Sequence, residues 1–505
     1  MERRTARRIV VVSFVLGLLA VRLCYDLPIG LNAPVLTILV LAGAILTRPA
    51  GAHFDPLDAW LPAAAVALTV GSALRADPVL QFVDLGLALA LVGAAVPAIA
   101  GYAITRSTAL VLSGIGVRVM TSIAIAGVPI LIASSPAPDG TAFASGRKAA
   151  APYVRGLLIA FPVVLLFVGL FAGADAVFAQ VARDALHPDL ELGDLPTRGT
   201  LTLAVAWLAA GLFAMWASIL PTVESGPVEG WPVPAGWTPP ANQTRTAATT
   251  EAFVVLAAVD AIFALFVGLQ VAYLFGDRDT LAVAGMTYSD YARRGFFELV
   301  IVAVLAVGLV VVIDRLIGRR SRAVVGASVV LLAFTAVVLV SALVRLRLYQ
   351  DAYGWTELRF YVLTTIFFLA FALVTTVVLL VRDRIAWLGH ALVMGGVAAV
   401  VALAAIGPVG FIADRNLERA LHPELVPAGG RTGIDAAYVA SLGDDAIPAL
   451  VAAYGKLPPA DDRLVGLALQ ERWAVLRDFP ADGDPAAWNL GRARARAALV
   501  ARFGP

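Results

Sequence analysis

The sequence is poor in charged residues and has almost no cysteine. Asp, Glu, Lys and Arg make up only 15% of its 505 residues, whereas soluble domains contain about 25%. Its 38 basic and 36 acidic residues nearly cancel, which gives a net charge of +2 and excludes the strongly basic surface of a nucleic-acid-binding protein. The single cysteine, Cys24, cannot form an internal disulfide.

Motifs for established chemistry are also missing from the sequence. The four histidines are scattered, and none has a Cys or His neighbour at the spacing of a zinc site. No Gly-rich phosphate loop, Ser/His/Asp set or HExxH pattern occurs, so we set aside an ATP-driven machine. We therefore predict no metal site, no cofactor and no nucleic-acid partner.

Hydrophobic residues are abundant instead. They make up 60% of the chain, and the mean hydropathy is +0.86. A helix needs about 20 apolar residues to cross the roughly 30 Å of hydrocarbon in a bilayer. Runs of about that length occur at 9–25, 31–47, 58–75, 79–104, 154–178, 199–220, 251–275, 295–314, 323–344, 358–381 and 385–408.

These runs predict an all-α fold, a polytopic transmembrane bundle of about eleven spans with a small soluble helical tail. The apolar stretch 108–134 has Arg118 near its centre, and we expect it to lie on the membrane surface because a charge inside the bilayer is costly. The arginine cluster at 315–322 then lies on the same side as the basic N-terminus. Together with the Arg-, Ala- and Val-rich composition, this predicts a bacterial inner-membrane protein with its N-terminus inside and its tail outside.

The chain divides into three predicted parts. Residues 1–150 hold N-terminal membrane helices and the interfacial segment, 151–408 the core bundle, and 409–505 the soluble tail. Within the tail, apolar residues at i, i+3, i+4 and i+7 predict amphipathic helices. These helices are expected at 434–442, 446–455, 464–479 and 486–503. The tail is either a structural cap on the bundle or a ligand-binding module, and we favour the cap.

Two polar clusters stand at the outer ends of predicted spans, each with a Glu at the start of an inward-running helix. Their members are Tyr288, Tyr291, Arg294 and Glu298 in the first, and Tyr349, Tyr353, Glu357 and Arg359 in the second. If the helix continues through Gly354, residues Arg345 to Tyr361 at every fourth position form one polar and aromatic stripe. Because an isolated charge in a low dielectric is costly, we expect Glu298 and Glu357 to share a network with nearby arginines.

The clusters have two interpretations. Tyr, Trp and Arg commonly lie at membrane interfaces, where they fix helix positions without chemistry. Alternatively the clusters form a binding site, because charged residues inside membranes are often functional. A separate candidate is Asp260, near the middle of a predicted span, which would either couple proton or ion movement or bond to a neighbouring helix.

The same residues carry a family resemblance. Tyr288–Leu299 (YxxYxRRGFFEL) and Tyr353–Arg359 (YGxTELR) resemble the signatures of a family of bacterial multi-pass membrane proteins, a domain of unknown function. Segments 173–178, 414–416 and 434–438 are also similar to it. The likeness covers roughly 150–505 and implies a membrane protein, without implying a reaction.

Three functions remain open. The first is an envelope sensor or scaffold whose tail contacts another envelope protein. The second is a solute or ion transporter that uses Asp260. The third is a membrane enzyme on an envelope or lipid-linked substrate, in which Glu298 or Glu357 acts as acid or base. We favour the first over the second and rank the enzyme last. About eleven spans exceed what an anchor needs, and an odd number without a clear two-fold repeat is unlike common transporters.

Overall fold

A computed structural model describes most of the chain as helix. The described residues are 3–49, 51–107, 119, 122–123, 194–214, 252–265, 267–268, 296–317, 321–427, 430, 433–477, 479 and 483–504. Contacts divide the chain into two compact units, which we describe separately. The first comprises Met1–Leu74, Gln81–Pro227 and Pro480–Leu490, and the second comprises Arg75–Leu80, Val228–Phe479 and Gly491–Pro505.

The first unit is a bundle of apolar helices. Its helices are α1 (Arg3–Cys24), α2 (Asn32–Thr47), α3 (Trp60–Leu74), α4 (Pro78–Ile99) and α9 (Leu195–Phe213). Helix α1 packs closely on α9, because a Cβ on Gly17 would lie only 2.3 Å from the carbonyl oxygen of Thr202. The described residues 483–490 return to this unit, where the Asn489 side chain donates to the carbonyl oxygen of Ser72 at 3.1 Å.

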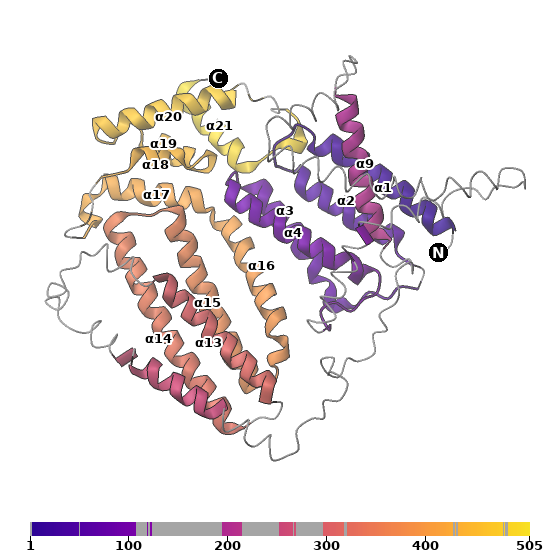
Figure 1. Cartoon of the computed structure of the whole chain (residues 1–505). Coiled ribbons are helices and arrows are strands. Elements are labelled where there is room, and N and C mark those ends of the chain that lie inside the picture. The colour runs from indigo at the N-terminus through magenta and orange to yellow at the C-terminus, as the bar shows by residue number, and fades with distance from the viewer. Residues whose placement is uncertain are drawn as a thin grey trace, which may run out of the picture. The chain divides into compact units, whose positions relative to one another are not determined.

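The second unit contains a set of apolar helices that run back and forth (Figure 1). They are a helix at Ala252–Leu265, then α13 (Phe296–Ile317), α14 (Arg322–Tyr353), α15 (Glu357–Val381) and α16 (Leu388–Ile406), with a short 3₁₀ turn at Ile385–Trp387 before α16. Leucine, valine and isoleucine side chains from these helices form one buried cluster. Helices α14 and α16 end on the same side of the unit, where the chain continues into the tail.

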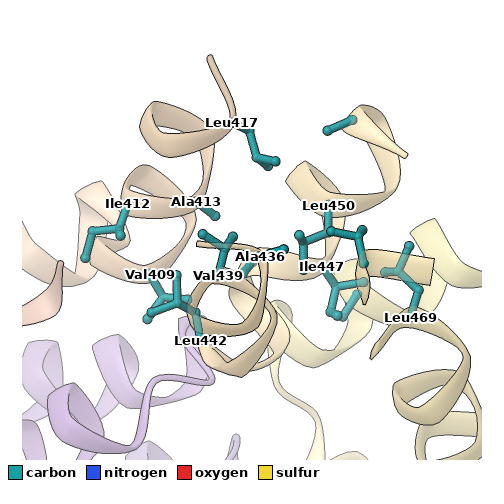
Figure 2. Packing of buried hydrophobic residues seen from close by; sticks show 14 of the residues in the cluster. Val409, Ile412, Ala413, Leu417, Ala436, Val439, Leu442, Ile447, Leu450 and Leu469 are labelled. Atoms are coloured by element: carbon teal, nitrogen blue, oxygen red, sulfur yellow. The ribbon is translucent and has the colours of Figure 1, made fainter. Parts of the chain in front are cut away.

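The described residues of the tail fold into five further α-helices, which we call the cap. They are α17 (Pro408–Leu421), α18 (Ala436–Ser441), α19 (Ile447–Ala453), α20 (Pro459–Arg477) and α21 (Leu490–Phe503). In Figure 1 they lie across the ends of α14, α15 and α16. Figure 2 shows how buried side chains of α17, α18, α19 and α20 meet, among them Ile412, Val439, Leu450 and Leu469. The same cluster includes Phe360 of α15 and Leu403 of α16, so cap and membrane helices share a core.

The prediction of an all-helical fold with helices able to cross a membrane is confirmed for the described residues. The helices long and apolar enough to do so are Pro56–Leu74, Pro78–Ile99, Arg322–Tyr353, Glu357–Val381 and Ile385–Ile406. The shorter apolar ones are Asn32–Thr47, Thr197–Phe213, Ala252–Leu265 and Val302–Asp314. The predicted span 154–178 lies outside the described residues, as does almost all of 108–134. The three-part division at 150 and 408 stays a prediction.

Helix α17 was not among the predicted tail helices. Gly407 and Pro408 stop α16, and the sequence then looks like a loop. However, the buried residues of α17 recur at the spacing of one helix face. They are Val409, Ile412, Ala413, Asn416 and Leu417. Pro408 occupies the first helical turn, where its missing N–H costs nothing.

Candidate functional site

The second polar cluster lies where α14 turns into α15. Helix α14 ends at Tyr353, because Gly354 has a φ of +81°, a conformation that a residue with a Cβ rarely adopts. Thr356 then caps α15, and its Oγ1 accepts the N–H of Arg359 at 3.3 Å. The conditional prediction of one helix through Gly354 is therefore wrong. We call Gly354–Thr356 the hairpin tip.

Asn416 of α17 holds the backbone of the hairpin tip. Its Oδ1 accepts the N–H of Trp355 at 2.8 Å, and its Nδ2 donates to the carbonyl oxygen of Trp355, also at 2.8 Å. A Cβ on Gly354 would lie 2.7 Å from Oδ1 of Asn416 and 2.6 Å from Nη1 of Arg419. Gly354 is thus required both by its φ and by the close approach of α17.

Arg359 binds the end of α14. Its Nη1 donates to the carbonyl oxygens of Tyr353 at 3.1 Å and Gly354 at 2.5 Å, and its guanidinium lies 4.1 Å from the ring centroid of Tyr349. The last carbonyls of a helix lack partners within the helix and carry partial negative charge. Arg359 therefore caps α14, and among the described residues no ion pair joins it to Glu357.

Arg419 of α17 also binds the last carbonyls of α14. Its Nη1 and Nη2 donate to the carbonyl oxygens of Gln350 at 3.4 Å and Ala352 at 3.3 Å. Burial lowers the pKa of Arg419; the carboxylate of Asp351 opposes this effect and the positive charge of Arg359 adds to it. Two guanidinium groups, one from α15 and one from the cap, thus share the last turn of α14.

Tyr438 of α18 binds the first turn of α15. Its hydroxyl oxygen accepts the N–H of Glu357 at 2.8 Å, which satisfies one of the free donors of a helix start. Asp435 caps α18 and accepts the N–H of Tyr438 at 3.1 Å, so the tyrosine is held in place. Burial raises the pKa of Tyr438, which keeps the phenol protonated.

The segment Arg75–Leu80 contributes from an earlier part of the chain. The side chain of Arg75 donates at 2.6 Å to the carbonyl oxygens of both Ala404 and Ala405, at the end of α16. Asp77 accepts the hydroxyl proton of Tyr361, in the second turn of α15, at 3.0 Å. This segment therefore binds the ends of two neighbouring membrane helices.

A further bond connects this segment to the cap. The N–H of Ala76 donates to Oδ2 of Asp445 at 2.8 Å. The pKa of Asp445 is raised, mainly by burial and also by the charges of Asp77 and Asp444. The hydrogen bond from Ala76 and the charge of Arg75 act in the opposite direction. A Cβ on Gly491 would lie 2.9 Å from the nitrogen of Ala76, so glycine is needed there too.

The comparison with known families gives one match, and it covers this whole site. The model of a family described as "Domain of unknown function (DUF4153)" matches residues 63–453. The chain belongs to the DUF4153 family. With its long apolar helices, it is an integral membrane protein. No curated protein and no solved structure matches the chain.

The DUF4153 region brings four of the nine predicted site residues together. Tyr349, Tyr353, Glu357 and Arg359 all lie at or beside the hairpin tip, and the rings of Tyr349 and Tyr353 are 5.0 Å apart. The residues of the other cluster that lie outside the described part are Tyr288, Tyr291 and Arg294, while Glu298 falls in α13 without a described side chain.

Asp260 lies apart, in the helix Ala252–Leu265. Its Oδ1 is buried and has no hydrogen-bond partner in the described part of the chain. The predicted bond to a neighbouring helix is therefore not among the contacts that the structure describes. The coupling role that we considered for Asp260 stays a prediction.

Sequence reasoning missed the residues of the DUF4153 region that hold the hairpin tip from outside. Arg419 and Asp77 gave no signal by type or spacing, whereas Asn416 stands in a segment that resembled the family and shares the periodic buried face of α17. Tyr438 stands in a segment that resembled the family, but its role there was not foreseen. The polar atoms of Asn416, Arg419 and Tyr438 bind backbone groups of α14, the tip and α15, so these residues fix the position of the cap on the hairpin.

Proposed function

We propose that this DUF4153 protein is an envelope scaffold or sensor, in which the cap binds a protein partner and the hairpin tip carries the effect to α14 and α15. The hydrogen bonds between two cap side chains and the backbone at the hairpin tip and the start of α15 support this function. Asn416 binds Trp355 and Tyr438 binds Glu357, all at 2.8 Å. Because these bonds hold backbone groups, a displacement of α17 or α18 should move the first turn of α15 with it.

We place the protein in a bacterial inner membrane with about eleven spans, the N-terminus inside and the cap outside. The hairpin tip and the cap lie on one side of the second unit, in keeping with this orientation. A periplasm-specific phosphatase fused after Pro505 should be active. Activity of a cytoplasm-specific reporter alone would reverse the orientation.

Helix α20 offers the surface that we assign to the partner. Leu464, Leu467 and Val475 are 48%, 57% and 47% exposed. Their spacing of three and eight residues places them on one face of the helix. Apolar side chains gathered on an exposed face are typical of protein interaction sites.

Photo-crosslinking in cells tests this surface. A photoreactive amino acid at Leu467 should give a discrete cross-link to an envelope protein. The control position is Arg494, an exposed residue of α21, which should give none. Loss of the cross-link in the double variant Leu464→Glu, Val475→Glu would confirm the face. A chain that forms no discrete cross-link from Leu467, or forms the same one from Arg494, contradicts the proposal.

A transporter is the second candidate. It is favoured by the buried Oδ1 of Asp260, which has no hydrogen-bond partner among the described residues. Under this function, Asp260→Asn should abolish proton or solute flux in reconstituted vesicles without reducing the amount of folded protein. Asp314→Asn, near the end of α13, is the control. Equal flux in the wild type and the Asp260 variant would exclude coupling through this carboxylate.

A further inference from the structure

The outer end of α14 combines an exposed apolar stripe with an arginine that has no ion-pair partner in the described part of the chain. The stripe consists of Val337, Val340 and Val344, which are 38%, 58% and 37% exposed. At a rise of about 1.5 Å per residue, the apolar stretch from Ala323 to Val344 covers roughly 33 Å, enough for the hydrocarbon layer. The helix continues to Tyr353, so its last turns extend into the headgroup layer.

Arg347 stands in this layer. It is exposed, follows Val344 by three residues and therefore lies about 4.5 Å further along the axis. Its guanidinium is 5.6 Å from the ring centroid of Trp355 in the hairpin tip. Among the described residues it has neither an ion pair nor a hydrogen bond, so its forked N–H donors are available to a ligand.

No described residue forms an ion pair with Arg347. Asp351, one turn further along α14, acts electrostatically on Arg419. Arg415 of α17 is paired with Glu418 at 2.8 Å. Among the described residues of this edge, Arg347 is therefore a cation that can bind an anion from outside the chain.

Aromatic rings pack behind Trp355, the residue that Arg347 contacts. Trp355 meets Phe411 of α17 edge to face with ring centroids 5.1 Å apart, and Arg415 lies 5.4 Å from the Phe411 ring. Tryptophan is favoured at headgroup level because its ring is apolar and its N–H is polar. Arginine binds phosphate through two parallel hydrogen bonds, which a planar guanidinium provides in a fixed geometry.

We propose that Arg347 and Trp355 form a binding site for the phosphate of an anionic phospholipid, whose acyl chain lies along Val337, Val340 and Val344. The phosphate lies at the end of the apolar stripe and accepts from the guanidinium, while the indole ring covers the glycerol region. The lipid therefore contacts the hairpin tip directly.

Lipid-dependent thermal unfolding of the purified full chain in a non-ionic detergent tests this site. Short-chain phosphatidylglycerol should raise the unfolding temperature in a saturable way. Short-chain phosphatidylcholine should raise it less, because its ammonium group cancels the charge that Arg347 recognises. Inorganic phosphate at the same concentration should have no effect, because it lacks the chain that contacts the stripe.

The variant Arg347→Gln should weaken the apparent affinity for phosphatidylglycerol about fivefold, since one arginine near a membrane surface contributes roughly 1 kcal/mol. The control is Arg382→Gln, which removes an exposed arginine at the other end of α15 and should leave the affinity unchanged. Both variants should unfold at the wild-type temperature without lipid.

Three results would overturn the proposal. Equal stabilisation by both lipids would exclude recognition of the headgroup charge. The same stabilisation by inorganic phosphate would indicate a free-anion site. An equal loss of affinity in the Arg382 variant would indicate a general charge effect. Leu467 cross-linking serves as an independent readout of the partner surface and should persist in Arg347→Gln.

Discussion

Replacing Asn416 by alanine should loosen the hairpin tip from the cap. Asn416 is only 9% exposed, and its amide makes both bonds to the backbone of Trp355, each at 2.8 Å. Alanine would leave one N–H and one carbonyl of Trp355 without partners. A buried polar group left unpaired costs about 1–3 kcal/mol; because these two bonds are only part-buried, the expected loss of stability is about 2 kcal/mol in total.

Hydrogen exchange at the tip measures this loss directly. A loss of about 2 kcal/mol would speed exchange of the Trp355 amide roughly 30-fold. The control is Thr376→Val, because the buried hydroxyl of Thr376 bonds only within its own helix, to the carbonyl of Ala372 at 2.7 Å. The control should leave Trp355 exchange unchanged. Wild-type exchange at Trp355 in Asn416→Ala would refute the view that α17 holds the tip.

Three other substitutions test the contacts between the cap and the membrane helices. Gly354→Ala should destabilise the chain by about 1–3 kcal/mol in a thermal melt because of its positive φ, whereas Gly326→Ala, in open space within α14, should be neutral or slightly stabilising. Tyr438→Phe should cost about 1–2 kcal/mol and speed exchange of the Glu357 amide; unchanged exchange would count against this cap. Because burial raises the pKa of Asp445 above its ordinary 3.8, the folded state holds that proton more tightly, so stability should fall as pH rises from about 3.8 through the folded pKa. Denaturant melts of Asp445→Asn should lack this decline; an identical pH profile in the variant would refute it.

The helices of this protein could be predicted because apolar runs report directly on membrane spans. The predicted run 323–344 became α14, although the helix extends to Tyr353. Polar residues such as Gln350 continue a helix as well as apolar ones do, so hydropathy marks the hydrocarbon layer and not the end of the helix. The end is set by Gly354, which has a positive φ and leaves room for the close approach of α17.

The site was only partly predictable, because its bonds join distant parts of the chain. The segment Tyr349–Arg359 was identified from its polar residues between apolar runs. The partner of Trp355 follows 61 residues later, and the partner of Tyr361 precedes it by 284. A single sequence contains no signal for such pairs. Arg359 was expected to share a network with Glu298 and Glu357, whereas the described contacts have it donate to the free carbonyls at the end of α14.

The core shared by α15, α16 and the cap has a consequence for biosynthesis. Phe360 and Leu403 precede α17 to α21 in the chain, so α15 and α16 leave the ribosome before the cap helices do. Both residues belong to the buried cluster that also holds Ile412 and Leu450 of the cap. A chain with a misinserted hairpin would therefore leave part of this apolar surface of the cap uncovered and accessible to proteases.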